Sequence, residues 1–210
     1  LSGASGVGKS SLLLAMANLE SSECIAQLVW IEDTPKISLM AQQPAFTLNP
    51  VRKVGKSLLD VYNSHSVEDN FKSIIQFCSL DEKGQLLDRY PHECSGGEIQ
   101  RLVLAMSMFQ SPDILLLDEP TAGIDHLTAG NILLAIKRWA KQKGACCLIA
   151  SHDDHLLSAY SDERYMIENQ KLVQIEELSR KLNPMVETSS KRDKKEFNDS
   201  DRQGVLYEIN

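Results

Sequence analysis

The residues Gly3 to Ser10 match the pattern G-x-x-x-x-G-K-[ST] and run into an apolar helical stretch. Glycines let a backbone fold around a polyphosphate with its N–H groups pointing inward, and a helix N-terminus favours negative charge. Lys9 is expected to reach the β- and γ-phosphates, and the Ser10 hydroxyl is expected to ligate Mg²⁺. A Gly/Ser-rich loop that only turns the chain is the alternative. We predict a nucleotide-binding phosphate loop made by Gly3, Ala4, Ser5, Gly6, Val7, Gly8, Lys9, Ser10 and Ser11.

An acidic pair, Asp118-Glu119, directly follows the apolar run 114–117, which has the composition of a strand covered on both faces. Ligands of open α/β sheets bind at the carboxyl ends of such strands. Asp118 is therefore predicted to hold the Mg²⁺ shell, and Glu119 to polarise the attacking water as a general base. Two acids that merely begin a surface loop are the alternative.

His152 follows a second predicted buried strand, 145–150, so it is expected at the same edge of the sheet. A neutral imidazole there could bond a γ-phosphate oxygen or the attacking water. The alternative is an incidental histidine at a strand end. The neighbouring His155 is expected to be solvated.

A second anion-binding pattern, Ser95-Gly96-Gly97-Glu98, precedes the apolar helical run 102–109. A serine and flexible glycines place a hydroxyl and backbone N–H groups at a helix start, as in the phosphate loop. One chain rarely needs two phosphate cradles for one nucleotide. We therefore predict that Ser95, Gly96 and Gly97 serve a nucleotide held by another copy.

Apolar strand-like runs alternate with amphipathic helical stretches along the chain, which predicts an α/β fold with a mostly parallel sheet. Residues 51–110 are predicted to form a mostly helical subdomain inserted into this core. A terminal pair of short strands is predicted to form an edge hairpin. The predicted strands are 28–31, 37–40, 114–117, 145–150, 165–167 and 172–175, and the principal helices are 10–19 and 127–141, the latter closed by Gly144.

In their order and context these motifs resemble those of an ATP-binding cassette (ABC) ATPase, a P-loop NTPase type. The resemblance spans nearly all of residues 1–176 and includes the segments Gln42, Cys94–Glu98, Thr121–Asp125 and His152. It implies a head-to-tail dimer, as a homodimer, a heterodimer or a fused tandem. Two ATP molecules with Mg²⁺ would be sandwiched in that dimer, each between the phosphate loop of one domain and the Ser-Gly-Gly segment of the other.

The same resemblance assigns roles by position. Gln42 would sense Mg²⁺ and the γ-phosphate, contributing to metal binding and catalysis, and would couple to a partner. Asp125 would belong to the nucleotide site and link the two sites of the dimer. His152 would complete hydrolysis. Cys94 stands where the family usually has leucine, a modest change because Ser95 and Gly97 make the polar contacts.

A finer resemblance is to the ATPases of dipeptide, oligopeptide and nickel importers. It rests on the segments Gln42–Pro50 and Tyr90–Glu93. It implies an ATP hydrolase at the cytoplasmic face of the cell membrane that energises import of peptides or nickel and other metal complexes through a membrane permease. A solute-binding protein would act indirectly. The helical subdomain and the segment after Gln42 would form a groove for a coupling helix of the permease.

Composition bears on the alternatives. The net charge of −7 and the absence of a basic stripe argue against nucleic acid as a partner, although a soluble cassette ATPase acting on nucleic acid or the ribosome is the main rival. A non-hydrolysing binding domain is a third possibility, against which the complete set of Lys9, Asp118, Glu119 and His152 stands. The 5 cysteines form no C-x-x-C pair, which fits a reducing compartment.

The predicted domain boundaries are an ATPase domain over 1–178, a polar linker over 179–204, and the possible start of a second cassette over 205–210. The strand that feeds the phosphate loop is expected to lie before Leu1. We therefore expect the sequence to be part of a tandem protein with two fused cassettes. The adenine-stacking residue of the family lies upstream of the phosphate loop, so base binding is not assigned to any residue here.

Overall fold

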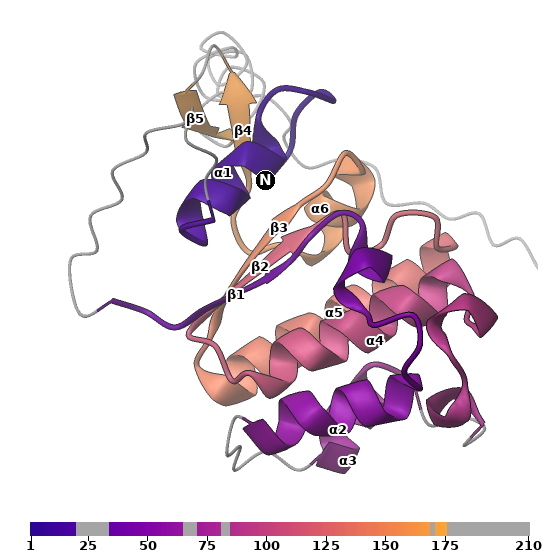
Figure 1. Cartoon of the computed structure of the whole chain (residues 1–210). Helices are drawn as coiled ribbons and strands as arrows, with labels where there is room; N and C mark the ends of the chain where they lie inside the picture. Colours follow the sequence, from indigo (N-terminus) through magenta and orange to yellow (C-terminus); the bar gives the residue numbers. More distant parts are fainter. Residues whose placement is uncertain (20–33, 65–70, 81–84, 169–170, 176–210) are drawn as a thin grey trace, which may run out of the picture.

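The computed structural model describes residues 1–19, 34–64, 71–80, 85–168 and 171–175 (Figure 1). The predicted strand 28–31, the linker and the segment 205–210 lie outside these described residues. The helices are α1 (Lys9–Met16), α2 (Val54–Ser64), α3 (Phe71–Phe77), α4 (Gly96–Phe109), α5 (His126–Lys143) and α6 (Asp154–Tyr160), with short 3₁₀ turns η1 (Pro44–Thr47), η2 (Leu86–Asp88) and η3 (Pro91–Glu93). The strands are β1 (Ile37–Met40), β2 (Ile114–Asp118), β3 (Cys146–Ala150), β4 (Tyr165–Glu168) and β5 (Lys171–Gln174).

The central sheet is parallel, with the strand order β1-β2-β3. Its middle strand β2 carries three leucines, Leu115 to Leu117, that are fully buried. This confirms the predicted α/β fold with a parallel sheet. The prediction that residues 145–150 form an equally buried strand was wrong for its beginning, because Cys146 is exposed and only Ala150 is fully covered. The reason is position: β3 pairs with β2 along its whole length, but on its other side Leu1 bonds only to the carboxyl end, at Ile149 and Ser151. The beginning of β3 therefore has a neighbouring strand on one side only within the described residues.

Alternate side chains of β2 belong to two different cores, because successive residues of a strand point to opposite faces. Leu116 packs with Leu13 of α1, whereas Leu115 and Leu117 join the large core that contains residues of α2, α3, α4 and α5. Helix α1 therefore covers one face of the sheet, and α4 and α5 cover the other. Figure 1 shows the same arrangement, with α1 above the strands and α4 and α5 below them.

The residues before the phosphate loop are hydrogen-bonded between β3 and the terminal hairpin. The Leu1 nitrogen donates to the Ile149 carbonyl over 2.6 Å, and the Ser151 N–H donates to the Leu1 carbonyl over 3.1 Å. On the other side the Ser2 N–H donates to the Tyr165 carbonyl over 2.8 Å. Strands β4 and β5 pair antiparallel, which confirms the predicted hairpin. The phosphate loop thus leaves the sheet from a position beside β3.

The described elements between residues 51 and 110 are all helical, as predicted. A cluster of three aromatic rings, Tyr62, Phe71 and Phe109, joins α2, α3 and α4 with centroid separations of 5.1 to 5.3 Å. Helix α4 also packs against β1 and η1. It therefore connects the helical region rigidly to the sheet. None of the described helices has both the length and the apolar character that a membrane crossing requires.

Gly55 allows α2 to approach the segment that leads to α4. A Cβ at this position would lie 2.6 Å from the Leu87 carbonyl oxygen and 2.9 Å from the Leu87 Cβ. Overpacking of this kind costs about 1–3 kcal/mol, which exceeds the gain of up to about 1 kcal/mol in helix propensity. We expect Gly55→Ala to lower the melting temperature by about 2–4 °C or more in thermal denaturation. The control is Leu59→Ala, at a position of α2 that is 46% exposed; equal melting temperatures for the two variants would contradict the prediction.

Candidate nucleotide-binding and catalytic site

The phosphate loop wraps around the side chain of Lys9. Gly3, Gly6 and Gly8 have φ values of 140°, 77° and 107°, a region that glycine enters without steric cost. Lys9 is only 8% exposed, and its Nζ donates to the carbonyl oxygens of Gly3 over 2.7 Å and Ala4 over 3.1 Å. The ammonium group is therefore held in the loop by neutral carbonyl acceptors, and no ion pair to a carboxylate is formed within the described residues.

This loop has the donor set that a polyphosphate requires. An ammonium has three N–H donors, and the carbonyls of the loop use two of them. The first N–H groups of α1 have no acceptor within the helix, and its first turn holds no acidic residue that would repel an anion. Ser10 and Ser11 place hydroxyl groups in the same turn. A nucleotide phosphate chain with its Mg²⁺ thus fits the predicted residues 3–11.

Glu119 lies at the carboxyl end of β2 in an unusual backbone conformation. Its φ is 51°, in the left-handed region that residues other than glycine seldom adopt. Two backbone hydrogen bonds hold it there: its N–H donates to the Ala150 carbonyl over 2.9 Å, and its carbonyl accepts from the Ala122 N–H over 3.1 Å. Asp118 precedes it on β2 and is also buried, at 6% exposed.

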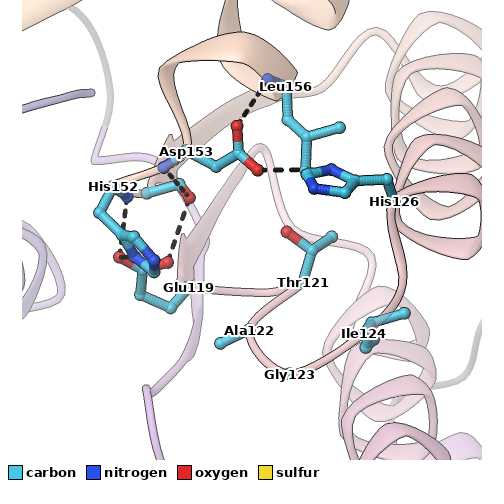
Figure 2. Close-up of a pocket in the computed structure, with 10 residues that line it drawn as sticks. Glu119, Thr121, Ala122, Gly123, Ile124, His126, His152, Asp153 and Leu156 are labelled. Atoms are coloured by element: carbon cyan, nitrogen blue, oxygen red, sulfur yellow. Dashed lines mark hydrogen bonds and ion pairs between the residues drawn. The ribbon is translucent and has the colours of Figure 1, made fainter.

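The Glu119 carboxylate accepts hydrogen bonds from the residues that follow β3. The Ser151 hydroxyl lies 3.1 Å from Oε2, and the His152 backbone N–H donates to Oε1 over 2.9 Å. The His152 ring Nδ1 lies 2.8 Å from the same Oε1 (Figure 2). The prediction that Glu119 and His152 meet at one edge of the sheet is confirmed. Sequence reasoning did not single out Ser151, and its position immediately before His152 was the available signal.

The two partners differ strongly in exposure. The Glu119 side chain is 9% exposed and the His152 side chain 70% exposed. Glu119 therefore has a fixed carboxylate beside a ring that solvent or a ligand can reach. An imidazole that donates through Nδ1 leaves Nε2 as an outward acceptor. The described side chain of His155 is exposed, as predicted.

A cavity of about 180 Å³ adjoins this pair, lined by Glu119, His152 and the loop 121–125 that follows β2. Figure 2 shows Thr121 to Ile124 passing along one side of it. On its far side the His126 ring faces the Asp153 carboxylate, with 3.7 Å between Nδ1 and Oδ2. The cavity brings together residues from the ends of β2 and β3 and the starts of α5 and α6. Sequence reasoning missed His126 and Asp153, because only the packing of α5 against α6 places them opposite each other.

Ser95 forms a capping box at the start of α4. Its Oγ accepts from the Glu98 N–H over 3.2 Å, and its own N–H donates to Glu98 Oε2 over 2.7 Å. A Cβ added to Gly96 would meet nothing within 4 Å. The predicted helix start at the Ser-Gly-Gly segment is confirmed, and Gly96 leaves open space in front of the helix. Cys94 packs behind it, where its Sγ donates to the Tyr90 carbonyl over 3.4 Å and burial raises the pKa of the thiol.

The remaining predicted residues occupy separate positions. Gln42 follows β1 and is exposed, and because β1 pairs in parallel with β2 it lies at the same edge of the sheet as Glu119. Asp125 caps α5, where its Oδ1 accepts from the Thr128 N–H over 3.0 Å. That hydrogen bond lowers the pKa of the Asp125 carboxyl. Within the described part of the chain neither Gln42 nor Asp125 makes a hydrogen bond or ion pair with Glu119, so their roles stay predictions.

Comparison with known families identifies this arrangement. The family model described as ABC transporter matches residues 1–122, more than half of the chain. The chain belongs to the ABC transporter family. The matched residues include the phosphate loop, the segment Cys94–Glu98 and the pair Asp118-Glu119.

Curated relatives with similar sequences are ATP-binding proteins of transport systems. The dipeptide transport ATP-binding protein of Bacillus subtilis (strain 168) is 29% identical over 145 residues, which cover 66% of this chain and 43% of that protein. The oligopeptide transport ATP-binding protein of Lactococcus lactis subsp. cremoris (strain SK11) is 26% identical over 183 residues, covering 76% and 54%. The metal-staphylopine import system ATP-binding protein of Staphylococcus aureus (strain Mu50) is 28% identical over 144 residues, covering 66% and 53%. The chain spans about half the length of these relatives.

Solved structures share the cassette fold. A bacterial ABC transporter cassette solved as a dimer superposes with a TM-score of 0.67 at 20% identity, covering 82% of this chain and 83% of that one. An archaeal ribosome recycling factor in complex with a ribosomal stalk protein gives a TM-score of 0.65 at 22% identity, covering 86% and 35%. At these identities the likeness concerns the fold. The predicted ABC ATPase fold is confirmed.

The capping box makes the stability of α4 depend on pH. The Ser95 backbone N–H holds the pKa of the Glu98 carboxyl below its ordinary value of 4.5, with further help from the Ser95 hydroxyl and Arg89. A group with a lowered folded pKa stabilises the fold above its unfolded pKa, and this contribution is lost as the pH falls through the folded value. We expect Glu98→Gln, which keeps a capping acceptor, to be less stable than wild type at about pH 7, and we expect this difference to disappear as the pH falls through the lowered folded pKa of Glu98.

Chemical denaturation across this range measures the difference in unfolding free energy. The control is Glu168→Gln, at an exposed position at the end of β4. A difference for Glu98→Gln that grew on acidification would contradict this role of the carboxylate.

Proposed function

We propose that this chain hydrolyses ATP as the ATP-binding subunit of an importer for peptides or metal complexes. The observation that carries the hydrolytic part is the Glu119 carboxylate, buried beside Asp118 and held by the Ser151 hydroxyl and two groups of His152. A general base must be fixed in place and able to reach the attacking water. These donors fix the Glu119 carboxylate in place. Glu119 also lines a cavity in which an attacking water could lie within its reach.

The other residues divide the remaining tasks. Lys9 and the N–H groups at the start of α1 would bind the phosphate chain, and Ser10, Asp118 and Gln42 would hold Mg²⁺. When bound, Mg²⁺ supplies positive charge that neutralises the phosphate oxygens during transfer. Glu119 orients the attacking water and takes its proton. His152, through its exposed ring, aligns the Glu119 carboxylate and offers Nε2 to the reacting groups.

Two copies of the cassette would complete each site. Helix α1 and helix α4 cover opposite faces of the sheet. The phosphate loop and the Ser95 segment of one chain therefore lie in different layers and are not expected to bind the same nucleotide. The open space in front of Gly96 leaves room for a phosphate held by a second cassette. These observations support a head-to-tail pair in which Ser95, Gly96 and Gly97 contact the partner's nucleotide.

A membrane permease is the proposed partner of the helical region. The 3₁₀ turn η1 and the residues after it expose two large apolar side chains, Phe46 at 86% and Val51 at 82%. They lie in the segment that follows Gln42, next to α2 and α4. Apolar side chains exposed at this level favour a protein contact. The transport systems named for the relatives above favour a peptide or metal importer over a cassette that acts on nucleic acid.

Glu119→Gln tests the hydrolytic role. We expect this variant to bind ATP with wild-type affinity, because the amide keeps the size of the side chain. Turnover should fall by about 10²–10⁴-fold, because an amide cannot take a proton from water. Nucleotide titration and phosphate release measure the two quantities on the complete protein. Wild-type phosphate release from Glu119→Gln would refute the assignment of Glu119.

The same variant tests the paired arrangement. With ATP and Mg²⁺, Glu119→Gln should accumulate as a closed pair in light-scattering or sedimentation measurements. Adding Gly96→Asp should abolish that pair, because a carboxylate in front of α4 would repel the partner's γ-phosphate. The open space around Gly96 and its place in the first turn of α4 mean that the single chain should tolerate the change. A pair that persisted in the double variant would contradict the placement of the second nucleotide contact.

Co-purification tests the importer role. The complete protein should be recovered with a membrane permease from solubilised membranes, and Phe46→Asp should reduce that recovery at least several-fold while leaving ATP binding unchanged. Leu127→Asp, at a 78% exposed residue of α5 away from η1, provides the matched control. Recovery with ribosomes or nucleic acid in place of a permease would favour the rival function.

A further inference from the structure

Gln100 is a buried polar residue of α4 that the site described above does not use. It is 8% exposed, and its Nε2 donates to the Ala122 carbonyl oxygen over 3.0 Å. Its other polar atom, Oε1, is buried and has no hydrogen-bond partner among the residues that the structure describes. Within that part of the chain the side chain therefore makes a single hydrogen bond, to the loop that lines the cavity beside Glu119.

The orientation of this amide follows from its neighbour. A carbonyl oxygen only accepts hydrogen bonds, so the Nε2 end of Gln100 must face Ala122. Leaving Oε1 buried and unpaired costs free energy, and a buried apolar side chain of similar shape would avoid that cost. The stability of the fold alone thus gives no reason for an amide at this position. The hydrogen bond to the Ala122 carbonyl provides one.

This bond continues to Glu119. The Ala122 N–H donates to the Glu119 carbonyl over 3.1 Å, which closes the turn that keeps Glu119 in its left-handed conformation. The start of α4 also lies near this loop, since a Cβ added to Gly97 would be 3.7 Å from the Ile124 side chain. The hydrogen bond of Gln100 is therefore made where α4 lies close to the loop 121–125, and it leads directly to the backbone of Glu119.

We infer that Gln100 is a positioning residue that ties α4 to the loop 121–125 and so holds the backbone turn that aims Glu119. This inference rests on the proposed hydrolytic function of Glu119. It has a consequence for the pair of cassettes: α4 begins at Ser95, which is proposed to contact the partner's nucleotide, whereas Glu119 acts on the chain's own nucleotide. Gln100 links the Ser95 segment to the Glu119 turn within one chain. A shift of α4 when two cassettes pair therefore changes the alignment of Glu119.

Gln100→Met tests this link, because methionine has nearly the same length but no donor. Ala122 is exposed, so water can replace the lost donor, and the unpaired Oε1 disappears. We expect the melting temperature to stay the same or rise. The kcat for ATP should fall about tenfold or more, since small misplacement of a catalytic group is costly, while the KM for ATP should not change. Gln76→Met, at an exposed position of α3, is the matched control and should leave all three values unchanged.

Hydrogen exchange of the nucleotide-free protein provides a readout that does not depend on activity. The amides of Ala122 and Ile124 should exchange faster in Gln100→Met than in wild type or in Gln76→Met. Unchanged exchange in this loop, or an unchanged kcat, would overturn the inference, as would a loss of kcat that merely accompanies a lower melting temperature.

The proposed function can fail separately. If Glu119→Gln hydrolyses ATP at the wild-type rate, the hydrolytic role of Glu119 is refuted. In that case faster amide hydrogen exchange of Ala122 and Ile124 in Gln100→Met still supports the positioning of the loop by Gln100. Unchanged hydrogen exchange still overturns that positioning role.

Discussion

The site depends on the parallel pairing of β2 with β3. The register places Asp118 opposite Ala150, so the residues that follow each strand, Glu119 and Ser151-His152, emerge side by side. Side chains of a strand alternate between faces, and a slip of one residue would move His152 away from the carboxylate. The register also supplies the Ala150 carbonyl that accepts the Glu119 N–H. One ladder of backbone hydrogen bonds therefore sets both the conformation of Glu119 and its partners.

The same strand separates two binding segments. Leu116 faces α1, and Leu115 and Leu117 face the core beneath α4 and α5, so the phosphate loop and the Ser95 segment belong to opposite layers. Both segments have the same local physics, in which glycines and a helix start present donors to an anion. Their separation by the sheet is the structural basis for assigning them to two different nucleotides. The hydrogen bond from Gln100 to Ala122 connects the α4 layer to the loop that follows Glu119.

Glu119 is one of the non-glycine residues with a left-handed backbone, and it is the one that lies in the proposed catalytic site. Glycines occupy the left-handed positions of the phosphate loop, where the conformation is not costly for them. Glu119 adopts a similar φ without that freedom, and a conformation of this kind persists only where its surroundings hold it. Two backbone hydrogen bonds of Glu119, with Ala150 and with Ala122, provide that support, and Gln100 in turn donates to the Ala122 carbonyl. The edge that carries Glu119 is thus fixed where the proposed hydrolysis requires a fixed carboxylate.

Sequence by itself determined the local features of this protein. The phosphate loop, the capped start of α4 at Ser95, the closure of α5 at Gly144 and the apolar strand β2 each depend on residues close together in the chain, so their side-chain types predict them. The order of the strand-like runs also predicted that Glu119 and His152 share one edge of the sheet. The tertiary structure alone decided the contacts made there and elsewhere. It brought Ser151 to Glu119, faced His126 toward Asp153, exposed the start of β3 and joined Gln100 to Ala122, because strand register and helix packing arise from contacts between residues far apart in sequence, which no local pattern encodes.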